Sequence, residues 1–294
     1  MSAAGPPARA DLAPASASRA DPARAAATGR PRCRLIALDV DGTLVDRSLK
    51  VRPRNREALA AARAAGVSLV LATGRMFRSA LPYAELLDAD QPLVCYQGAM
   101  VRTRDGQTLR EWAVAPEAAA RAVELSRAHR LHVNLYQDDN FYVEDLGEGA
   151  RRYAAVAQVE AVKVDDLMAV AAGGSTKVVF VDDPQRLRAL EPELRAAFEP
   201  ASRITFSLPE FLEVVSAGAD KGGALAFVCQ RAGINPAEVV AAGDAPNDVE
   251  MLRFAGLALA PRDAFPEARA AADALIPPPQ EDGIAELVER WVLG

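Results

Sequence analysis

The stretch Asp39-Val-Asp-Gly-Thr-Leu44, which follows the apolar run Leu35-Ile-Ala-Leu38, decides the fold predicted for this chain. A short apolar run followed by a glycine is typical of a buried strand and a tight turn. Residues two apart on a strand share a face, so Asp39 and Asp41 are expected to point to the place where the strand ends. Open α/β sheets bind ligands at that carboxyl edge. Two neighbouring carboxylates repel each other unless a cation or a shared proton relieves them, and this pairing suits Mg²⁺ and phosphate chemistry.

The sequence on both sides of this stretch alternates short apolar strands with helices. Such alternation predicts an α/β fold with a Rossmann-like, doubly wound parallel sheet. In the first half, strands are expected at 35–39, 67–72 and 93–96, and helices at 53–65 and 78–87. The pattern resumes with a helix at 221–232 that Asp220 is expected to cap. It then continues with strands at 239–242, 256–260 and 274–276 and helices at 264–272 and 284–292.

The middle of the chain has a different pattern, with a hairpin at 100–112 followed by mixed strands and helices. A segment of this size can form a domain of its own. We therefore predict a catalytic core made of residues 32–112 and 209–294, interrupted by an inserted α+β cap domain at 113–208. Residues 1–31 contain almost no large apolar side chains and are expected to form a disordered extension. Their arginine-rich composition resembles that of a mitochondrial transit peptide, but Asp11, Asp21 and several prolines argue against this interpretation.

Composition excludes several classes of protein. The net charge of -6 and the lack of a basic stripe argue against a nucleic-acid partner, and no apolar run is long enough for a membrane span. Three cysteines without metal-ligand spacing are expected to be buried thiols, which fits a reducing, cytoplasmic location. We expect a monomer or a weak homo-oligomer.

Four polar clusters lie just beyond predicted strands or at a helix start. Each alone has a simpler explanation as a turn or a helix cap, but four in this order along one sheet are hard to obtain by accident. The clusters are Asp39 with Asp41, Thr73, Lys221, and Asp244 with Asp248.

These clusters lie within motifs that resemble the four motifs of the haloacid dehalogenase superfamily. More narrowly, they resemble its Cof-type phosphatases, whose α/β cap lies between the second and third motifs. The resemblance covers the chain from about Arg34 to the C-terminus and implies a phosphatase fold and activity. The motifs are Asp39-Val-Asp-Gly-Thr, Ala72-Thr-Gly-Arg75, Lys221-Gly-Gly-Ala-Leu225 and Gly243-Asp-Ala-Pro-Asn-Asp248.

The resemblance implies a role for each carboxylate. Asp39 is expected to attack phosphorus and form an aspartyl-phosphate, and Asp41 to protonate the leaving alcohol and then activate water. Mg²⁺ is expected to be held by the Asp39 side chain, the Asp41 backbone carbonyl and Asp244. Asp248 is expected to hold a metal-bound water or to orient the site.

Further residues are expected to bind the phosphoryl group. Thr73 and the backbone of Gly74 are expected to donate hydrogen bonds, and Lys221 to neutralise charge and steady Asp39. Asn247 is expected to contact phosphate or to orient its neighbours. Arg75 has two open roles, a clamp on phosphate or substrate and a structural ion pair.

The cap is expected to contact the organic part of the substrate. Its candidates are Trp112, Asn134, Tyr136 and Lys177, although Lys177 is also explained as a solvated strand end, the reading the sequence favours. Gln97 stands where relatives usually carry Asn, close to the expected substrate.

The sequence therefore predicts a Mg²⁺-dependent phosphatase that hydrolyses a small phosphorylated metabolite such as a sugar phosphate. Two alternatives stay open: a phosphotransferase or phosphomutase of the same superfamily, and a non-catalytic protein that binds a phosphorylated ligand. A nucleotide-dependent dehydrogenase is disfavoured because no Gly-x-Gly-x-x-Gly follows the first strand.

Overall fold

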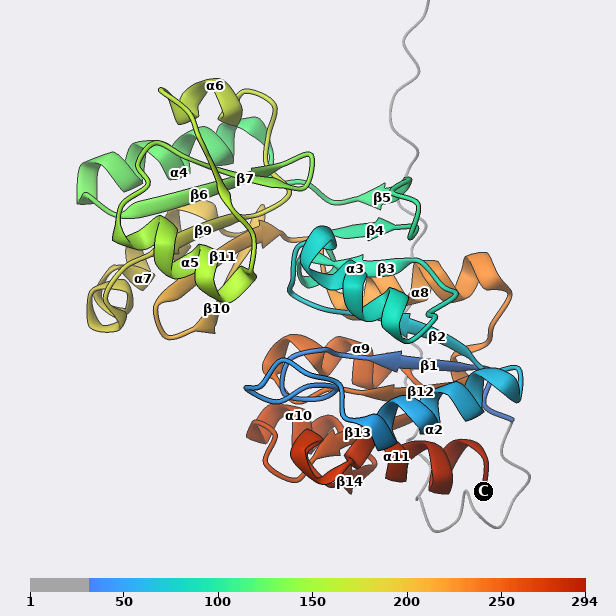
Figure 1. The fold of residues 1–294 in the computed structure, drawn as a ribbon. Coiled ribbons are helices and arrows are strands. Elements are labelled where there is room, and N and C mark those ends of the chain that lie inside the picture. The colour runs from blue at the N-terminus through green and yellow to red at the C-terminus, as the bar shows by residue number, and fades with distance from the viewer. Residues whose placement is uncertain (1–31) are drawn as a thin grey trace, which may run out of the picture. The chain divides into compact units, whose positions relative to one another are not determined.

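This computed structural model describes residues 32–294. A five-stranded parallel sheet forms the core of the half that is drawn in the lower part of Figure 1. The extension expected at residues 1–31 lies outside the described residues. Every neighbouring pair of strands in this sheet is parallel. In spatial order the strands are β14 (Ala274–Ile276), β13 (Leu257–Pro261), β12 (Val239–Ala242), β1 (Leu35–Leu38) and β2 (Ser68–Leu71).

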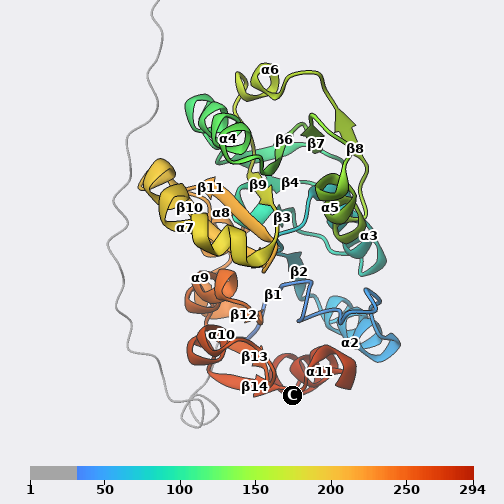
Figure 2. The ribbon, with the colours of Figure 1, turned by 90° about the vertical axis from the view of Figure 1, so that its left-hand side faces the viewer.

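Helices cover both faces of this sheet, as Figure 2 shows. Alternate residues of β1 pack into two different clusters: Ile36 and Leu38 lie with α2 and α11, whereas Leu35 and Ala37 lie with α8, α9 and α10. Burial on both faces explains why the strands are apolar throughout. The predicted doubly wound α/β fold is confirmed. The helices are α2 (Pro53–Ala64), α8 (Lys221–Ala232), α9 (Val249–Phe254), α10 (Pro266–Ala271) and α11 (Gly283–Leu287), the last continued by a π-helical turn (Val288–Val292).

The strand predicted at 93–96 is not a full member of the parallel sheet. It forms a separate antiparallel sheet of β3 (Leu93–Cys95), β4 (Met100–Arg102) and β5 (Thr108–Glu111), and a bridge between Ala72 and Val94 connects it to the end of β2. The reason is local. The 3₁₀ turn η1 (Tyr96–Gly98) has positive φ at all three residues, which reverses the chain directly into β4. Helix α3 (Phe77–Leu86) precedes this sheet.

The second large sheet contains six strands and belongs to the inserted segment. Its order is β10 (Ser202–Leu208), β11 (Phe211–Ser216), β9 (Val178–Val181), β6 (His132–Gln137), β7 (Asn140–Val143) and β8 (Ala161–Lys163). β11 pairs with β9 and β10, although the sequence analysis placed residues from 209 onward in the core. We therefore propose that the inserted domain extends to residue 216.

The two faces of this second sheet pack differently. Helices α4 (Pro116–His129), α6 (Leu167–Ala171) and α7 (Pro184–Phe198) share an apolar cluster with one face. Helix α5 (Glu148–Ala157) lies on the other face, where Tyr136, Phe141 and Phe211 belong to the same cluster as Tyr96 and the parallel sheet. The second face is therefore the one that contacts the core. Within residues 32–294, no helix combines the length and the apolarity that crossing a membrane requires.

Candidate active site

The predicted site residues emerge together at one edge of the parallel sheet. β1 lies between β12 and β2, and the register pairs Leu38 with Ala242 on one side and with Leu71 on the other. The residues that follow these three positions therefore leave the sheet side by side. They are Asp39 after β1, Thr73 after β2 and Asp244 after β12.

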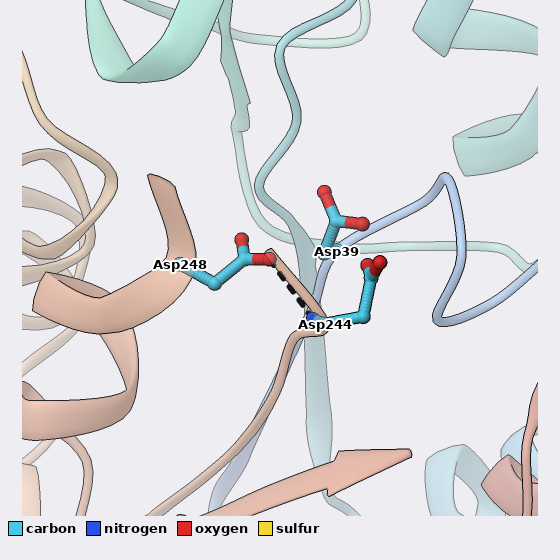
Figure 3. Close-up of side chains that lie close together, drawn as sticks. All are labelled: Asp39, Asp244 and Asp248. Carbon is cyan, nitrogen blue, oxygen red and sulfur yellow. Dashed lines mark hydrogen bonds between the residues drawn. The ribbon is translucent and has the colours of Figure 1, made fainter. Parts of the chain in front are cut away.

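Three carboxylates converge at this edge, and we call Asp39, Asp244 and Asp248 the acidic cluster (Figure 3). One oxygen from each lies within 4.8 Å of the other two. Burial and the neighbouring carboxylates outweigh the lysine nearby and raise the pKa of Asp39 well above its usual value, and they raise the pKa of Asp244 to about 6. Oxygen ligands with excess negative charge are what a hard divalent cation requires. The residues present therefore fit Mg²⁺.

The loop after β1 is shaped around Asp244. Gly42 has φ +87°, and a Cβ atom there would lie 2.4 Å from Asp244 Oδ2, so only glycine fits. The next residue, Thr43, donates a hydrogen bond from Oγ1 to Asp244 Oδ1 at 3.1 Å. The Asp-x-Asp-Gly-Thr motif thus holds the carboxylate of a residue 201 positions away.

Lys221 is a buried cation placed against the acidic cluster. Its Nζ atom lies 2.6 Å from Asp39 Oδ1 and 2.6 Å from Asp248 Oδ1. Burial disfavours its charge, but the two carboxylates outweigh burial and the pKa of Lys221 is raised. The residue begins α8, whose predicted cap is confirmed by the Asp220 carboxylate accepting from Gly223 N at 2.6 Å. This cap fixes the direction in which the helix starts, and so the place of Lys221.

Asp248 also shapes the loop that carries Asp244. Its Oδ2 atom accepts hydrogen bonds from the backbone N–H groups of Asp244 and Ala245, each at 3.0 Å. With Oδ1 bound to Lys221, both oxygens of Asp248 have protein partners. Asp248 therefore orients both Lys221 and the backbone of the loop that carries Asp244.

Thr73 and Gly74 form the loop after β2. Thr73 is fully buried, and its Oγ1 atom accepts from Arg75 N at 3.1 Å, which leaves the hydroxyl proton available to a ligand. A Cβ atom on Gly74 would lie 2.5 Å from Gln97 Nε2. The side chain of Gln97 therefore packs directly on this loop, where its Oε1 accepts from Asn247 Nδ2 at 2.5 Å.

Asp41 is not part of the acidic cluster, and its carboxylate is bound by Arg75. Arg75 Nε lies 2.7 Å from Asp41 Oδ2 and Arg75 Nη2 lies 2.6 Å from Asp41 Oδ1. Of the two open roles for Arg75, this structure contains the ion pair. The Arg75 side chain is 9% exposed whereas that of Asp41 is 50% exposed, so the carboxylate is held at the surface of the site.

The candidates for contact with the organic part of the substrate have different outcomes. The prediction of a solvated Lys177 is wrong, since the residue is 1% exposed and its Nζ lies 3.0 Å from Glu213 Oε1. Tyr136 and Asn134 are buried beside each other, while Trp112 is partly buried and stacks with Arg110. Glu213 was not among the residues predicted from the sequence. A charged residue inside the apolar run 211–215 was the available signal, because buried charges need partners.

Comparisons with known proteins show the family to which the chain belongs. A sequence model of the family described as haloacid dehalogenase-like hydrolase matches residues 36–288. The Bacillus subtilis (strain 168) protein named "Putative phosphatase YxeH" is 30% identical over 273 residues, covering 88% of this chain and 98% of that protein. A haloacid dehalogenase-like hydrolase from Bacteroides thetaiotaomicron superposes with a TM-score of 0.82 at 29% identity, covering 88% of this chain and 99% of the other. TM0651 from Thermotoga maritima superposes with a TM-score of 0.80 at 29% identity, covering 88% and 97%. The resemblance drawn from the four motifs is thus confirmed, and the chain belongs to the haloacid dehalogenase-like hydrolases.

Proposed function

We propose that this protein is a Mg²⁺-dependent phosphatase that hydrolyses a small phosphorylated metabolite, such as a sugar phosphate, through an aspartyl-phosphate. The observation that carries the proposal is the buried Asp39 carboxylate. Lys221 holds one of its oxygens at 2.6 Å, and two further carboxylates adjoin it. A carboxylate with a purely structural role needs one cationic partner. Here one lysine faces three carboxylates, so the site keeps a net negative charge that a cation can neutralise.

Asp39 is the proposed nucleophile. One of its oxygens attacks phosphorus, the bond from phosphorus to the ester oxygen breaks, and the phosphoryl group passes to Asp39. Lys221 fixes the carboxylate and offsets the negative charge that gathers on the phosphoryl oxygens. The hydroxyl of Thr73 and the backbone N–H of Gly74 donate hydrogen bonds to the same oxygens.

Asp41 is the proposed acid and base. It gives a proton to the departing alcohol oxygen and then takes one from the water that hydrolyses the aspartyl-phosphate. The bidentate contact with Arg75 keeps Asp41 at the rim of the site. Arg75 is therefore the proposed positioning residue for this carboxylate.

The acidic cluster would hold Mg²⁺ through Asp39 and Asp244, with the Asp41 backbone carbonyl as a further ligand and Asp248 orienting the loop. When bound, Mg²⁺ supplies positive charge that screens the phosphoryl oxygens from the attacking carboxylate. Burial and the neighbouring carboxylates raise the pKa values of Asp39 and Asp244, and a bound cation would relieve this repulsion, which supports the assignment.

Two alternatives to a phosphatase stay open. One transfers the phosphoryl group to a different acceptor, and the other binds the ligand without reaction. A phosphotransferase passes it to a second alcohol, whereas a phosphatase passes it to water. A non-catalytic binding protein has no need of both Asp39 and Asp41, and this chain keeps both.

A phosphate-release screen tests the proposal. Purified protein is incubated with a set of phosphorylated metabolites, once with Mg²⁺ and once with a chelator. We expect Mg²⁺-dependent release of free phosphate from at least one sugar phosphate. Transfer to a second alcohol without free phosphate would favour the phosphotransferase, and ligand binding without turnover would favour the binding protein.

A further inference from the structure

Lys177 and Glu213 form a buried ion pair in the inserted domain. Lys177 directly precedes β9, and Glu213 lies in the adjacent strand β11, where Val214 pairs with Val178. The Lys177 Nζ atom lies 3.0 Å from Glu213 Oε1, and the two side chains are only 2% and 3% exposed. None of the steps assigned above uses this pair.

The pair touches the loop that is proposed to bind the phosphoryl group. Lys177 Nζ donates to the backbone oxygen of Gly74 at 3.4 Å. On the other side, Gln97 Nε2 donates to Glu213 Oε2 at 3.4 Å. The pair therefore lies next to the loop that is proposed to bind the phosphoryl group.

Tyrosine rings surround Lys177, and an acceptor without a partner among the described residues lies on the far side of Gln97; both suit a ligand. The rings of Tyr96, Tyr136 and Tyr153 have their centroids 6.0, 5.2 and 5.8 Å from Lys177 Nζ. Beyond Gln97, the Oδ1 atom of Asn247 is buried without a hydrogen-bond partner among residues 32–294. It is an acceptor that a hydroxyl group could satisfy.

A purely structural pair is the simpler explanation, and its placement argues against it. A buried ion pair is a weak source of stability because both charges lose their hydration. Burial disfavours the charge on Lys177, yet Glu213 outweighs burial and raises its pKa, so the ammonium stays charged. A pair needed only to join β9 to β11 has no reason to lie against Gly74 and Gln97.

We propose that the Lys177–Glu213 pair binds the leaving group of the phosphate ester and selects leaving groups that carry hydroxyls near the ester oxygen. The inference rests on the proposed phosphatase function. Glu213 accepts hydrogen bonds from hydroxyls, Lys177 donates to their oxygens, and the tyrosine rings pack on the C–H face of the same group. An apolar leaving group would offer neither charged side chain a hydrogen bond, so the site disfavours it.

The test compares two esters in four proteins with Mg²⁺ present. The esters are a hexose phosphate and p-nitrophenyl phosphate, whose leaving group carries no additional hydroxyl. The proteins are the wild type, Glu213→Gln, the double variant Lys177→Met with Glu213→Gln, and the control Glu144→Gln. Glu144 is partly exposed in the same domain and pairs with Arg127. The double variant removes both charges together, so it leaves no unpaired buried charge and keeps the test informative if Glu213→Gln does not fold.

We expect kcat/KM for the hexose phosphate to fall about 100-fold in both Glu213 variants while that for p-nitrophenyl phosphate changes less than about threefold. The Glu144 control is expected to match the wild type on both esters. Equal losses on the two esters would overturn this inference and leave the proposed function intact. A wild type that releases phosphate from neither ester, nor from any metabolite in the screen, would overturn the proposed function itself.

Discussion

Two buried lysines serve the two regions of the molecule in different ways. Lys221 lies between two carboxylates, each 2.6 Å from its Nζ atom, and a third carboxylate adjoins them. Lys177 has one carboxylate partner at 3.0 Å and tyrosine rings around it. The acidic cluster at the sheet edge is therefore negative in sum, whereas the pair in the inserted domain is balanced. The first region fits a cation together with phosphate, and the second fits a neutral hydroxylated group.

The largest effect is expected where the negative region reacts. Asp39→Asn removes the attacking oxygen and one Mg²⁺ ligand, so phosphate release is expected to fall at least about 10⁴-fold with the fold retained. The measurement is steady-state phosphate release, with circular dichroism as the check on folding. The matched control is Asp46→Asn in the same loop, since the Asp46 carboxylate is partly exposed and accepts from Ser48 N at 2.8 Å. Undiminished turnover in Asp39→Asn would falsify its assignment as nucleophile.

Asp41→Asn is expected to slow the reaction by about 10²–10⁴-fold, because an amide neither gives nor takes the proton. Mg²⁺ affinity, measured by calorimetry, is expected to stay close to that of the wild type because the ligand proposed at this position is a backbone carbonyl. Loss of Mg²⁺ binding with proton transfer intact would contradict this division of roles. Arg75→Lys is the companion variant, since it keeps the charge but cannot make the bidentate contact with Asp41.

The two lysines themselves give a direct test of the charge comparison. Lys221→Met leaves two buried carboxylates without their cation and is expected to lower the free energy of unfolding by about 3–5 kcal/mol. Lys177→Met leaves one buried carboxylate, Glu213, without its cation. Because Glu213 keeps its contact with Gln97, a smaller loss in the free energy of unfolding is expected. Urea unfolding without Mg²⁺ measures both. Equal losses would mean that the two regions do not differ in charge balance as described.

The position of the motif residues at one sheet edge could be predicted because the residues of each motif are close together in the chain. Asp39, Thr73 and Asp244 each follow a strand, and parallel strands bring the residues after them to one edge whatever lies between. Asp220 likewise caps α8 three residues before the N–H group that it binds. Local spacing and strand direction were sufficient for these predictions.

The inserted domain was less predictable because its contacts join distant segments. Lys177 was expected to be solvated since it precedes an apolar strand, and only the pairing of β9 with β11 brings Glu213 to it. Strand β8 and helix α6 have no clear apolar period in the sequence, because they are short and β8 is largely exposed. The turn at η1 depends on left-handed backbone at Tyr96 and Gln97. Neither residue is a glycine, so the sequence does not indicate this conformation at these positions.

The smallest effect concerns the protons that Mg²⁺ would displace. The pKa of Asp244 is about 6 in the folded protein against 3.8 for an ordinary aspartate, mainly because of burial. The folded state therefore binds more protons between about pH 4 and pH 6, so the free energy of unfolding falls as pH rises through that window. Mg²⁺ binds the deprotonated carboxylates, and its stabilising effect is expected to grow over the same range. Thermal unfolding is expected to give a rise in Tm on adding Mg²⁺ that is about 2–4 °C larger near pH 7.5 than near pH 5. Asp244→Asn is expected to abolish this Mg²⁺ effect, while the exposed Asp263→Asn keeps it. An Asp244→Asn variant that Mg²⁺ still stabilises fully would remove Asp244 from the proposed ligands and leave the charge excess at the sheet edge without its proposed purpose.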